Sequence, residues 1–191
     1  MKIDFLEVKG TWRHVADACR TTVGKEAGIG EVSSNFKRRL LLAEHSPIRK
    51  LSYNWKWADL KSWISVHFVR HKFGIEHWVQ SQRPDRPSST ANRDEAPQGT
   101  LINHECEANA QAIINISRKR LCQQAMPETR EAWREVVRRI EQVEPELARV
   151  CVPDCVYRGW CYEMNSCGYH QTPAFAEAVN KYRHGINGWS D

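Results

Sequence analysis

The chain has 191 residues, of which 41% are hydrophobic and 27% charged, with a formal net charge of +5 and a pI near 8.9. This length predicts one domain with a substantial core. No apolar run approaches the roughly 20 residues of a membrane-spanning helix, so we expect none. The basic balance favours anionic ligands, but it does not separate a mononucleotide, a dinucleotide cofactor, a folate tail or nucleic acid.

The first ten residues and the cysteines indicate the cellular compartment. Lys2, Asp4, Glu7 and Lys9 occupy a stretch that would be apolar in a secretory signal. We therefore expect a cytoplasmic protein. The seven cysteines are an odd number, and in that compartment we expect reduced thiols rather than disulfides.

The N-terminal part of the chain combines strand and helix patterns. Residues 1–8 predict a strand, and residues 11–22 and 32–43 predict helices separated by a glycine-containing turn. Residues 51–57 alternate large apolar with polar side chains, which is typical of a strand with one buried face.

The next segment predicts an amphipathic helix over residues 58–72, with Asp59 as its N-cap and Gly74 ending it. Its apolar face would be formed by Leu60, Trp63, Ile64, His67, Phe68 and His71. A short strand is predicted over residues 75–82. Residues 84–99 are polar and rich in Pro, Ser and Asn, which indicates a loop.

Two long helices are predicted in the second half. The first covers residues 103–124, and Pro127 fits the first turn of the second, where its missing N–H costs nothing. An apolar stripe on the second helix comprises Trp133, Val136, Val137, Ile140 and Val143. Trp55, Trp57, Trp63 and Trp133 fall on core-facing positions. Without an internal repeat, the elements indicate an α+β fold in which helices flank a small sheet.

Anion-binding side chains gather between the predicted helix and the loop. Arg70-His71-Lys72 is followed by Ser81-Gln82-Arg83, and a hydroxyl beside a guanidinium fork suits a phosphate. The alternative for the triplet is a cationic helix end that complements the helix dipole. Beside these motifs, His77 and Trp78 are candidates for stacking on a ligand ring. His67 and His71 also have the spacing of a metal-chelating pair, although no nearby carboxylate completes such a site.

The segment RHKFGIEHWVQSQR resembles the signature of the flavin-dependent thymidylate synthases, in which an Arg-His-Arg triplet precedes a Ser and an Arg. A turn at Glu44–Pro47 that leads into residues 51–57 is similar to the family's Pro-containing turn and strand. Further similar elements are Asn109-Ala110, Arg120, Ala125, Glu128 and Arg130. The resemblance covers roughly residues 1–150, which we interpret as the catalytic domain, and it implies a small, twisted, mainly antiparallel sheet flanked by helices.

The resemblance also implies the site residues. It assigns FAD binding to Ser46, Arg70, His71, Lys72, Asn109 and Arg120. For Asn109 and Arg120, the alternative is polar pairing between buried helices. It assigns dUMP binding to His67, Ser81, Gln82, Arg83 and Arg130, with Ser81 and Arg130 as catalytic residues. The implied reaction is reductive methylation of dUMP to dTMP, with methylenetetrahydrofolate as carbon donor and NADPH as reductant through FAD. The implied assembly is a homotetramer whose subunits share active sites, and no cysteine nucleophile is required.

The chain departs from the family signature at several positions. Lys72 replaces the third residue of the triplet, and the stretch before Ser81 is one residue longer. Arg49 and Lys50 stand where relatives carry an acidic residue and a histidine. These departures keep open a flavin-dependent pyrimidine nucleotide hydroxymethylase on the same scaffold.

Residues 151–191 form a cysteine-rich extension that we expect to pack on the same domain. Cys151, Cys155, Cys161 and Cys167 lie near His170, but the spacings of three, five and five residues differ from those of common zinc modules. Buried reduced thiols are therefore the main interpretation. A zinc-containing nucleic-acid-binding protein is the alternative from another class, although acidic residues are nearly as numerous as basic ones.

Overall fold

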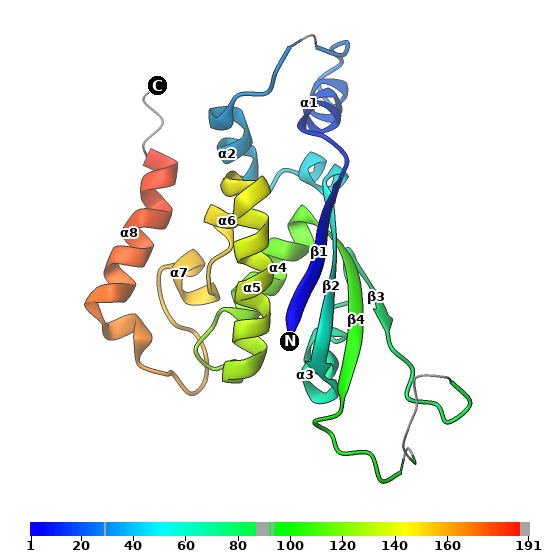
Figure 1. Cartoon of the computed structure of the whole chain (residues 1–191). Coiled ribbons are helices and arrows are strands. Elements are labelled where there is room, and N and C mark those ends of the chain that lie inside the picture. The colour runs from blue at the N-terminus through cyan, green and yellow to red at the C-terminus, as the bar shows by residue number, and fades with distance from the viewer. Residues whose placement is uncertain (29, 87–91, 93, 188–191) are drawn as a thin grey trace.

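The structure is a computed structural model that describes residues 1–28, 30–86, 92 and 94–187. Its centre is a four-stranded antiparallel sheet with the strand order β1-β2-β4-β3 (Figure 1). The strands are β1 (Lys2–Lys9), β2 (Ser52–Lys61), β3 (Ile75–Val79) and β4 (Leu101–Asn109). The predicted α+β fold is thus confirmed.

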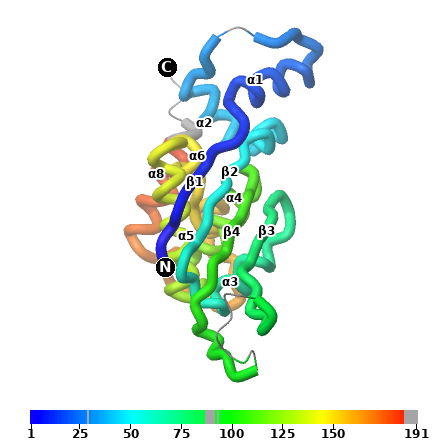
Figure 2. The backbone as a smooth tube through the Cα atoms, turned by 45° about the vertical axis from the view of Figure 1, so that its right-hand side comes forward, coloured from blue at the N-terminus to red at the C-terminus, as the bar shows by residue number. Residues whose placement is uncertain are grey.

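The helices lie mainly on one side of the sheet. Figure 1 shows α4 to α8 on that side with α8 outermost, while α1 lies beyond one end of the sheet, and Figure 2 shows the same layering after a 45° turn. Their bounds are α1 (Trp12–Thr21), α2 (Ser34–Leu42), η1 (Ser46–Lys50), α3 (Ser62–Phe68), α4 (Ala110–Arg120), α5 (Pro127–Val143), α6 (Pro145–Val150), α7 (Asp154–Arg158), η2 (Tyr169–Gln171) and α8 (Pro173–Asn187). Within the described residues, no helix is long and apolar enough to cross a membrane.

Local chemistry explains several helix ends. The Thr11 hydroxyl accepts a hydrogen bond from the backbone N–H of His14 at the start of α1, and the Ser33 hydroxyl does the same for Phe36 in α2. Pro127 is the first residue of α5, as predicted.

Aromatic residues form the centre of the core between the sheet and the helices. Tyr53, Trp55 and Trp57 alternate along β2 and are all fully buried. Trp55 packs edge to face against Trp133 of α5 with ring centroids 5.8 Å apart, and Trp57 stacks on Phe68 of α3 at 4.5 Å. The predicted core positions of Trp55, Trp57 and Trp133 are confirmed.

The edges of the predicted core differ from the structure. Trp63 is only half-buried at the core boundary. Val143, at the last position of α5, is 52% exposed, so its predicted place in the apolar stripe is wrong.

The other face of the sheet is polar. Lys9 forms an ion pair with Glu107 across the strands at 2.6 Å, and Lys56 pairs with Asp4 at 2.9 Å. An antiparallel sheet can keep one solvated face in this way, while its other face builds the core.

The predicted helix over residues 58–72 is wrong at its start and at its end. Strand β2 continues to Lys61 because Ala58 and Leu60 are buried beside β4, and α3 covers only Ser62–Phe68. Asp59 is not an N-cap, since it has φ +56° at a shift of the β2–β4 register. Asp tolerates this left-handed conformation better than most residues, so it marks a β-bulge. Gly74 lies beyond the helix, in the turn before β3.

The predicted helix over residues 103–124 is wrong in its first part, which belongs to the strand β4. Its first part alternates buried and more exposed side chains, which is the period-two pattern of β4; the buried residues are Ile102, His104, Cys106 and Ala108. The helix begins at Ala110, where the Asn109 side chain accepts a hydrogen bond from the backbone N–H of Ala112 at 2.9 Å.

The residues beyond position 150 pack on the rest of the chain. Cys151, Val156, Phe175 and Val179 belong to the same hydrophobic cluster as Trp133. All seven cysteines are free thiols. Of the predicted loop over residues 84–99, residues 87–91 and 93 lie outside the described part of the chain.

Candidate functional site

A pocket of about 760 Å³ lies between α3, the end of β3 and the start of β4. It is lined by Trp63 and His67 from α3, by residues 80–83 after β3, and by Ile102 of β4. The structure therefore brings together four residues of the predicted nucleotide site, which are His67, Ser81, Gln82 and Arg83.

Backbone hydrogen bonds fix the walls of this pocket. The N–H of Ser62 donates to the carbonyl of Thr100 at 2.9 Å, and the Ser62 hydroxyl donates to the carbonyl of Gln98 at 2.6 Å. On the opposite wall, Gln80 and Asn103 exchange two hydrogen bonds of 2.9 Å, one of them through the Gln80 side chain. The segment that carries Ser81 to Arg83 is thus held against β4.

Arg83 already binds a carboxylate. Its Nε and Nη2 donate to the two oxygens of Asp85 at 3.0 and 2.8 Å, a bidentate pair with both side chains more than half exposed. The Ser81 hydroxyl accepts a hydrogen bond from the backbone N–H of Arg83 at 3.3 Å. A guanidinium fork that holds a carboxylate has the geometry that also holds a phosphate.

His67 presents a neutral ring to the pocket. Its Nδ1 lies 2.8 Å from the hydroxyl of Thr129 on α5, and its ring packs edge to face on Trp63 with centroids 5.6 Å apart. Burial lowers the pKa of His67, and the positive charges of Arg120 and Arg70 lower it further. The imidazole therefore acts as a hydrogen-bonding group without a charge.

Arg120 holds the turn that carries Arg70, His71 and Lys72. Its guanidinium donates to the carbonyl of His67 near the end of α3, and its Nε donates to Nε2 of His71 at 2.9 Å. The first bond satisfies a helix carbonyl that has no partner within the helix. Arg70 and Lys72 remain exposed, and among the described residues neither side chain has a hydrogen-bond or ion-pair partner.

Asn109 and Gly74 connect the same turn to α4. Besides capping α4, Asn109 donates its backbone N–H to the carbonyl of Gly74 at 2.9 Å. Gly74 has φ +73°, and a Cβ at this position would lie 2.5 Å from the Asn109 amide nitrogen. Only glycine fits this close approach without strain.

A sequence family described as thymidylate synthase complementing protein matches residues 6–172. The chain belongs to this family. The resemblance to flavin-dependent thymidylate synthases that the sequence motif indicated is thereby confirmed, and the match extends past residue 150. No curated protein matches the chain in sequence.

Several solved structures share this fold. Two of them are flavin-dependent thymidylate synthase ThyX from Helicobacter pylori complexed with FAD and dUMP. They have TM-scores of 0.63 and 0.64, are 12% and 13% identical, and cover 80% of this chain and 100% and 99% of their own. A third is the UMP/dUMP methylase PolB from Streptomyces cacaoi bound with 5-Br dUMP, with a TM-score of 0.58, 12% identity, and coverage of 78% of this chain and 93% of its own.

Seven residues carried over from the family do not line the pocket: Arg70, His71, Lys72, Asn109 and Arg120, described above, and Ser46 and Arg130. Arg130 lies in the first turn of α5, and its Nη1 donates to the backbone carbonyls of Gln123 and Ala125 at 3.0 and 3.4 Å. Ser46 is exposed at the start of η1, beside the exposed Arg49 and Lys50.

The two predicted stacking residues of this family member do not line the pocket either. Trp78 is 53% exposed and pairs with Glu105, on the solvated side of the sheet. His77 turns to the opposite, interior side, where its Nε2 lies 2.9 Å from the carbonyl oxygen of His71. The His71 carbonyl oxygen accepts this hydrogen bond from His77. The His77 ring therefore helps to fix the turn that carries Arg70, His71 and Lys72.

His77 belongs to a compact interior cluster with His104 and Cys106. The distances are 3.0 Å between the two imidazole nitrogens and 3.3 and 3.2 Å from these to the sulfur. Because Nε2 of His77 donates to the His71 carbonyl, its Nδ1 is an acceptor for Nε2–H of His104. Burial, together with the charge of His77, lowers the pKa of His104 from 6.5 to about 4.

The two low-pKa histidines predict acid sensitivity. Burial lowers the pKa of His71 from 6.5 to about 4, and the charges of Arg120 and His77 add to this shift. Between about pH 6.5 and pH 4, these two histidines are protonated in the unfolded chain but not in the folded chain. The free energy of unfolding is therefore expected to be constant above about pH 6.5 and to fall as the pH drops toward 4.

Urea unfolding at several pH values measures this effect. The His71→Gln variant keeps an acceptor for Arg120 but cannot titrate, so its stability should fall less steeply between pH 6.5 and 4.5. Equal slopes for the variant and the parent chain would contradict the assignment.

The sequence patterns missed part of the pocket wall. Trp63 had been assigned to the core, and Ile102 to no site. Gln98 lies in the polar loop, where no sequence signal marks it as a wall residue. Its place depends on the hydrogen bonds of its carbonyl with Ser62 and Trp63.

Proposed function

We propose that this chain is a flavin-dependent thymidylate synthase that converts dUMP to dTMP, with methylenetetrahydrofolate as carbon donor and NADPH as the source of reducing equivalents. The observation that supports this most is the pocket that collects His67, Ser81, Gln82 and Arg83 in a member of the thymidylate synthase complementing protein family. Two structures of the same fold are complexes with FAD and dUMP.

The turn after α3 fits the anionic part of FAD. Arg70 and Lys72 offer two exposed positive charges with no internal partner among the described residues, and His71 between them is fixed by Arg120. These residues would hold the diphosphate, with Asn109 and Arg120 as positioning residues and Ser46 as a further contact. FAD, when bound, supplies the redox chemistry that reduces the transferred one-carbon group to a methyl group.

The protein's part in the reaction is binding and orientation of the nucleotide. Arg83 would bind the monophosphate with its guanidinium fork, exchanging Asp85 for the ligand, and Ser81 would hold the phosphate in register. Trp63 and His67 line the pocket with aromatic rings, which suits a pyrimidine. Arg130 would withdraw charge from the uracil after leaving the two carbonyls that it contacts.

A second candidate is a methylase that also accepts UMP. It is favoured by the likeness to the UMP/dUMP methylase PolB, with a TM-score of 0.58. Lys72 differs from the third residue of the family's triplet, and this departure also keeps hydroxymethyl transfer to the nucleotide as an alternative reaction. Both alternatives use the same pocket and differ in substrate or product.

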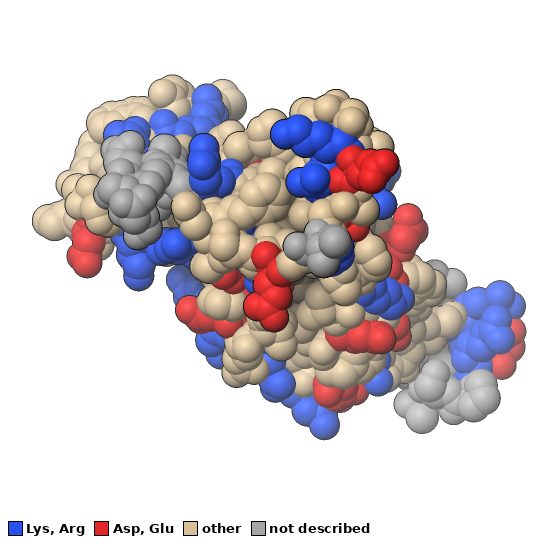
Figure 3. All heavy atoms as spheres, turned by 90° about the horizontal axis from the view of Figure 1, so that it is seen from above, with Lys and Arg blue, Asp and Glu red and all other residues tan. Residues whose placement is uncertain are grey.

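Nucleic-acid binding receives less support. On the face seen in Figure 3, Lys and Arg side chains are interspersed with Asp and Glu. A continuous basic surface of the kind that tracks a phosphate backbone is not formed on that face.

We also propose a homotetramer. Val66 and Val79 line the pocket and are 51% and 41% exposed, and Phe73 in the adjacent turn is 91% exposed. Exposed apolar side chains around a ligand pocket suit coverage by a neighbouring subunit. Light scattering should give about four times the chain mass of 22.2 kDa, whereas a monomeric mass would contradict this assembly.

The activity is tested by product analysis. Purified protein reconstituted with FAD is incubated with dUMP, methylenetetrahydrofolate and NADPH, and parallel reactions contain UMP. We expect dTMP, detected by mass spectrometry, and no product when FAD is omitted. A hydroxymethyl product or a preference for UMP would replace this proposal with the corresponding alternative, and a colourless protein that binds no flavin would overturn it.

A further inference from the structure

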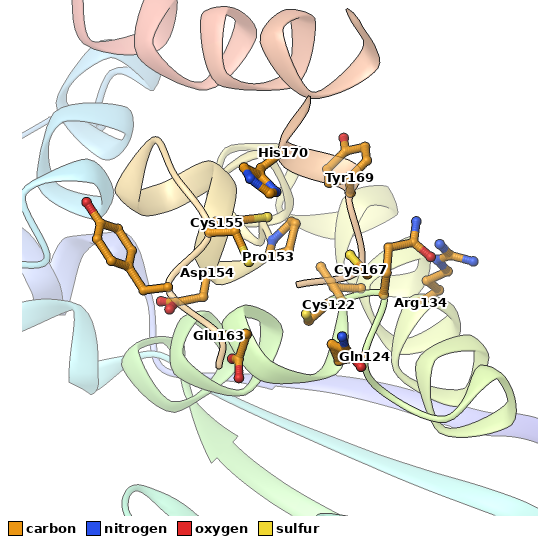
Figure 4. A pocket seen from close by; sticks show the side chains of 14 residues that line it. Cys122, Gln124, Arg134, Pro153, Asp154, Cys155, Glu163, Cys167, Tyr169 and His170 are labelled. Atoms are coloured by element: carbon orange, nitrogen blue, oxygen red, sulfur yellow. The ribbon is translucent and has the colours of Figure 1, made fainter. Parts of the chain in front are cut away.

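Four cysteines and a histidine surround a second pocket, which shares no lining residue with the proposed nucleotide pocket. It has a volume of about 270 Å³ and is lined by Cys122, Cys155, Cys161, Cys167 and His170. Figure 4 shows Cys122, Cys155, Cys167 and His170 around one common space. The thiols come from separate segments, namely the turn between α4 and α5, the helix α7, and the loop between α7 and η2.

This set differs from the one that the sequence suggested. Cys151 belongs to the hydrophobic core, is 7% exposed, and does not line the pocket. Cys122 takes its place, although the two lie far apart along the chain. Sequence spacing could not have found this set, because the fold brings the turn before α5 to the C-terminal segment.

The four thiols line one pocket, although no three of their sulfur atoms lie within 4.8 Å of one another. Several thiolates can share this space only if a cation compensates their charge.

We propose that this pocket is a structural zinc site in which Cys122, Cys155, Cys161 and Cys167 are the ligands. Four thiolates are a preferred tetrahedral set for Zn²⁺, and the binding releases the thiol protons. Charged residues also line the pocket: Arg134, and the carboxylates of Asp154 and Glu163, which pair with Arg158 and Lys119. Nδ1 of His170 lies 3.0 Å from the Ser166 hydroxyl, which leaves Nε2 available to a thiolate sulfur at the edge of the site.

The loop between α7 and η2 is held to α4 and the following turn by polar contacts: Nε2 of Gln124 donates to the carbonyl of Asn165 at 2.5 Å, and Lys119 pairs with Glu163 at 3.5 Å. Trp160, Tyr162 and Met164 are 51%, 61% and 101% exposed, so this loop contributes few side chains to the core. A metal ion that ties Cys161 and Cys167 to Cys122 would fix the loop against the turn between α4 and α5. Structural zinc supplies folding free energy where apolar burial is small.

A second ligand-type cluster is tighter but less suited to a metal ion. His77, His104 and Cys106 are the group of described residues whose donor atoms all lie within 4.8 Å of one another. Their mutual hydrogen bonds already explain this geometry, and the described residues add no fourth donor of the same kind. The pocket thiols are spaced more widely, so zinc binding there requires a change of cysteine χ1 that brings the sulfur atoms together.

The metal content of the full-length protein tests the proposal. Protein produced with added zinc and desalted is expected to contain about one zinc ion per chain by plasma mass spectrometry. The Cys122→Ser, Cys155→Ser, Cys161→Ser and Cys167→Ser variants should each lose at least about nine-tenths of it. The matched controls are Cys19→Ser on α1 and Cys151→Ala in the core, and both should keep it.

A spectroscopic measurement covers variants that fail to fold. Co²⁺ added to the parent protein in place of zinc should give thiolate-to-metal charge-transfer bands and the strong visible bands of tetrahedral cobalt. The absence of these bands after Co²⁺ is added to metal-free parent protein would overturn the proposal. Zinc retained by all four serine variants would also overturn it. A disulfide between two pocket cysteines in protein that binds no zinc would also overturn it. These readouts do not depend on flavin or on enzymatic activity.

Discussion

Trp133→Ala is expected to lower the free energy of unfolding by about 3–5 kcal/mol, the usual range for truncating a fully buried tryptophan. Trp133 is completely buried between Trp55 and Phe68, with ring centroids 5.8 and 5.9 Å away. Its Nε1 donates to the Ser117 hydroxyl at 2.9 Å, and this hydroxyl donates to the carbonyl of Ile113. The substitution removes the packing that joins α5 to both α3 and the sheet.

Denaturant unfolding followed by circular dichroism measures the change, at one fixed protein concentration because assembly contributes to apparent stability. Trp133→Phe is the matched control, since it keeps most of the ring volume, while it loses the hydrogen bond to Ser117 and a small part of the packing. It should cost less than the alanine variant. A loss below about 1 kcal/mol for Trp133→Ala would contradict a central role of this ring in the core.

The sequence predicted the elements with one clear period and missed those in which two periods overlap. The strand after residue 51 was found because Tyr53, Trp55 and Trp57 alternate strictly with polar residues. Residues 101–109 also alternate, but Ala108 and Ala112 fit a helical stripe equally well, so the strand β4 was assigned to the following helix. Only pairing with β2 and β3 decides between the two patterns.

Four residues of the motif line one pocket, the proposed nucleotide site, but the motif could not give their internal contacts. Arg120 and Asn109 were predicted as flavin contacts or as buried polar pairs, and the structure shows them bonded to His71 and to the backbone around Gly74. Arg83 was predicted to bind an anion, but its pairing with Asp85 depends on the turn that joins them. Such contacts follow from three-dimensional placement, which residue types alone do not determine.

Arg83 and Arg70 are expected to have separable roles. Arg83→Ala should weaken dUMP binding at least about tenfold, since charge-assisted hydrogen bonds of a guanidinium to phosphate contribute about 1.5–3 kcal/mol, and it should leave most of the flavin bound. Arg70→Ala should instead yield protein depleted of flavin. Both side chains are exposed, and the Arg83–Asp85 pair is too solvated to contribute much to folding. Flavin absorbance of the purified variants and calorimetric titration with dUMP measure the two effects.

Asp85→Asn is the control that makes the Arg83 prediction specific. The carboxylate of Asp85 competes with phosphate for the guanidinium, so neutralising it should preserve or strengthen dUMP binding, while Arg83→Lys should weaken it because lysine lacks the planar fork. Equal flavin loss in Arg70→Ala and Arg83→Ala would show that one site, not two, is being disrupted. Unchanged dUMP affinity in Arg83→Ala would show that the phosphate does not bind at Arg83 and is bound by other cationic side chains of the chain.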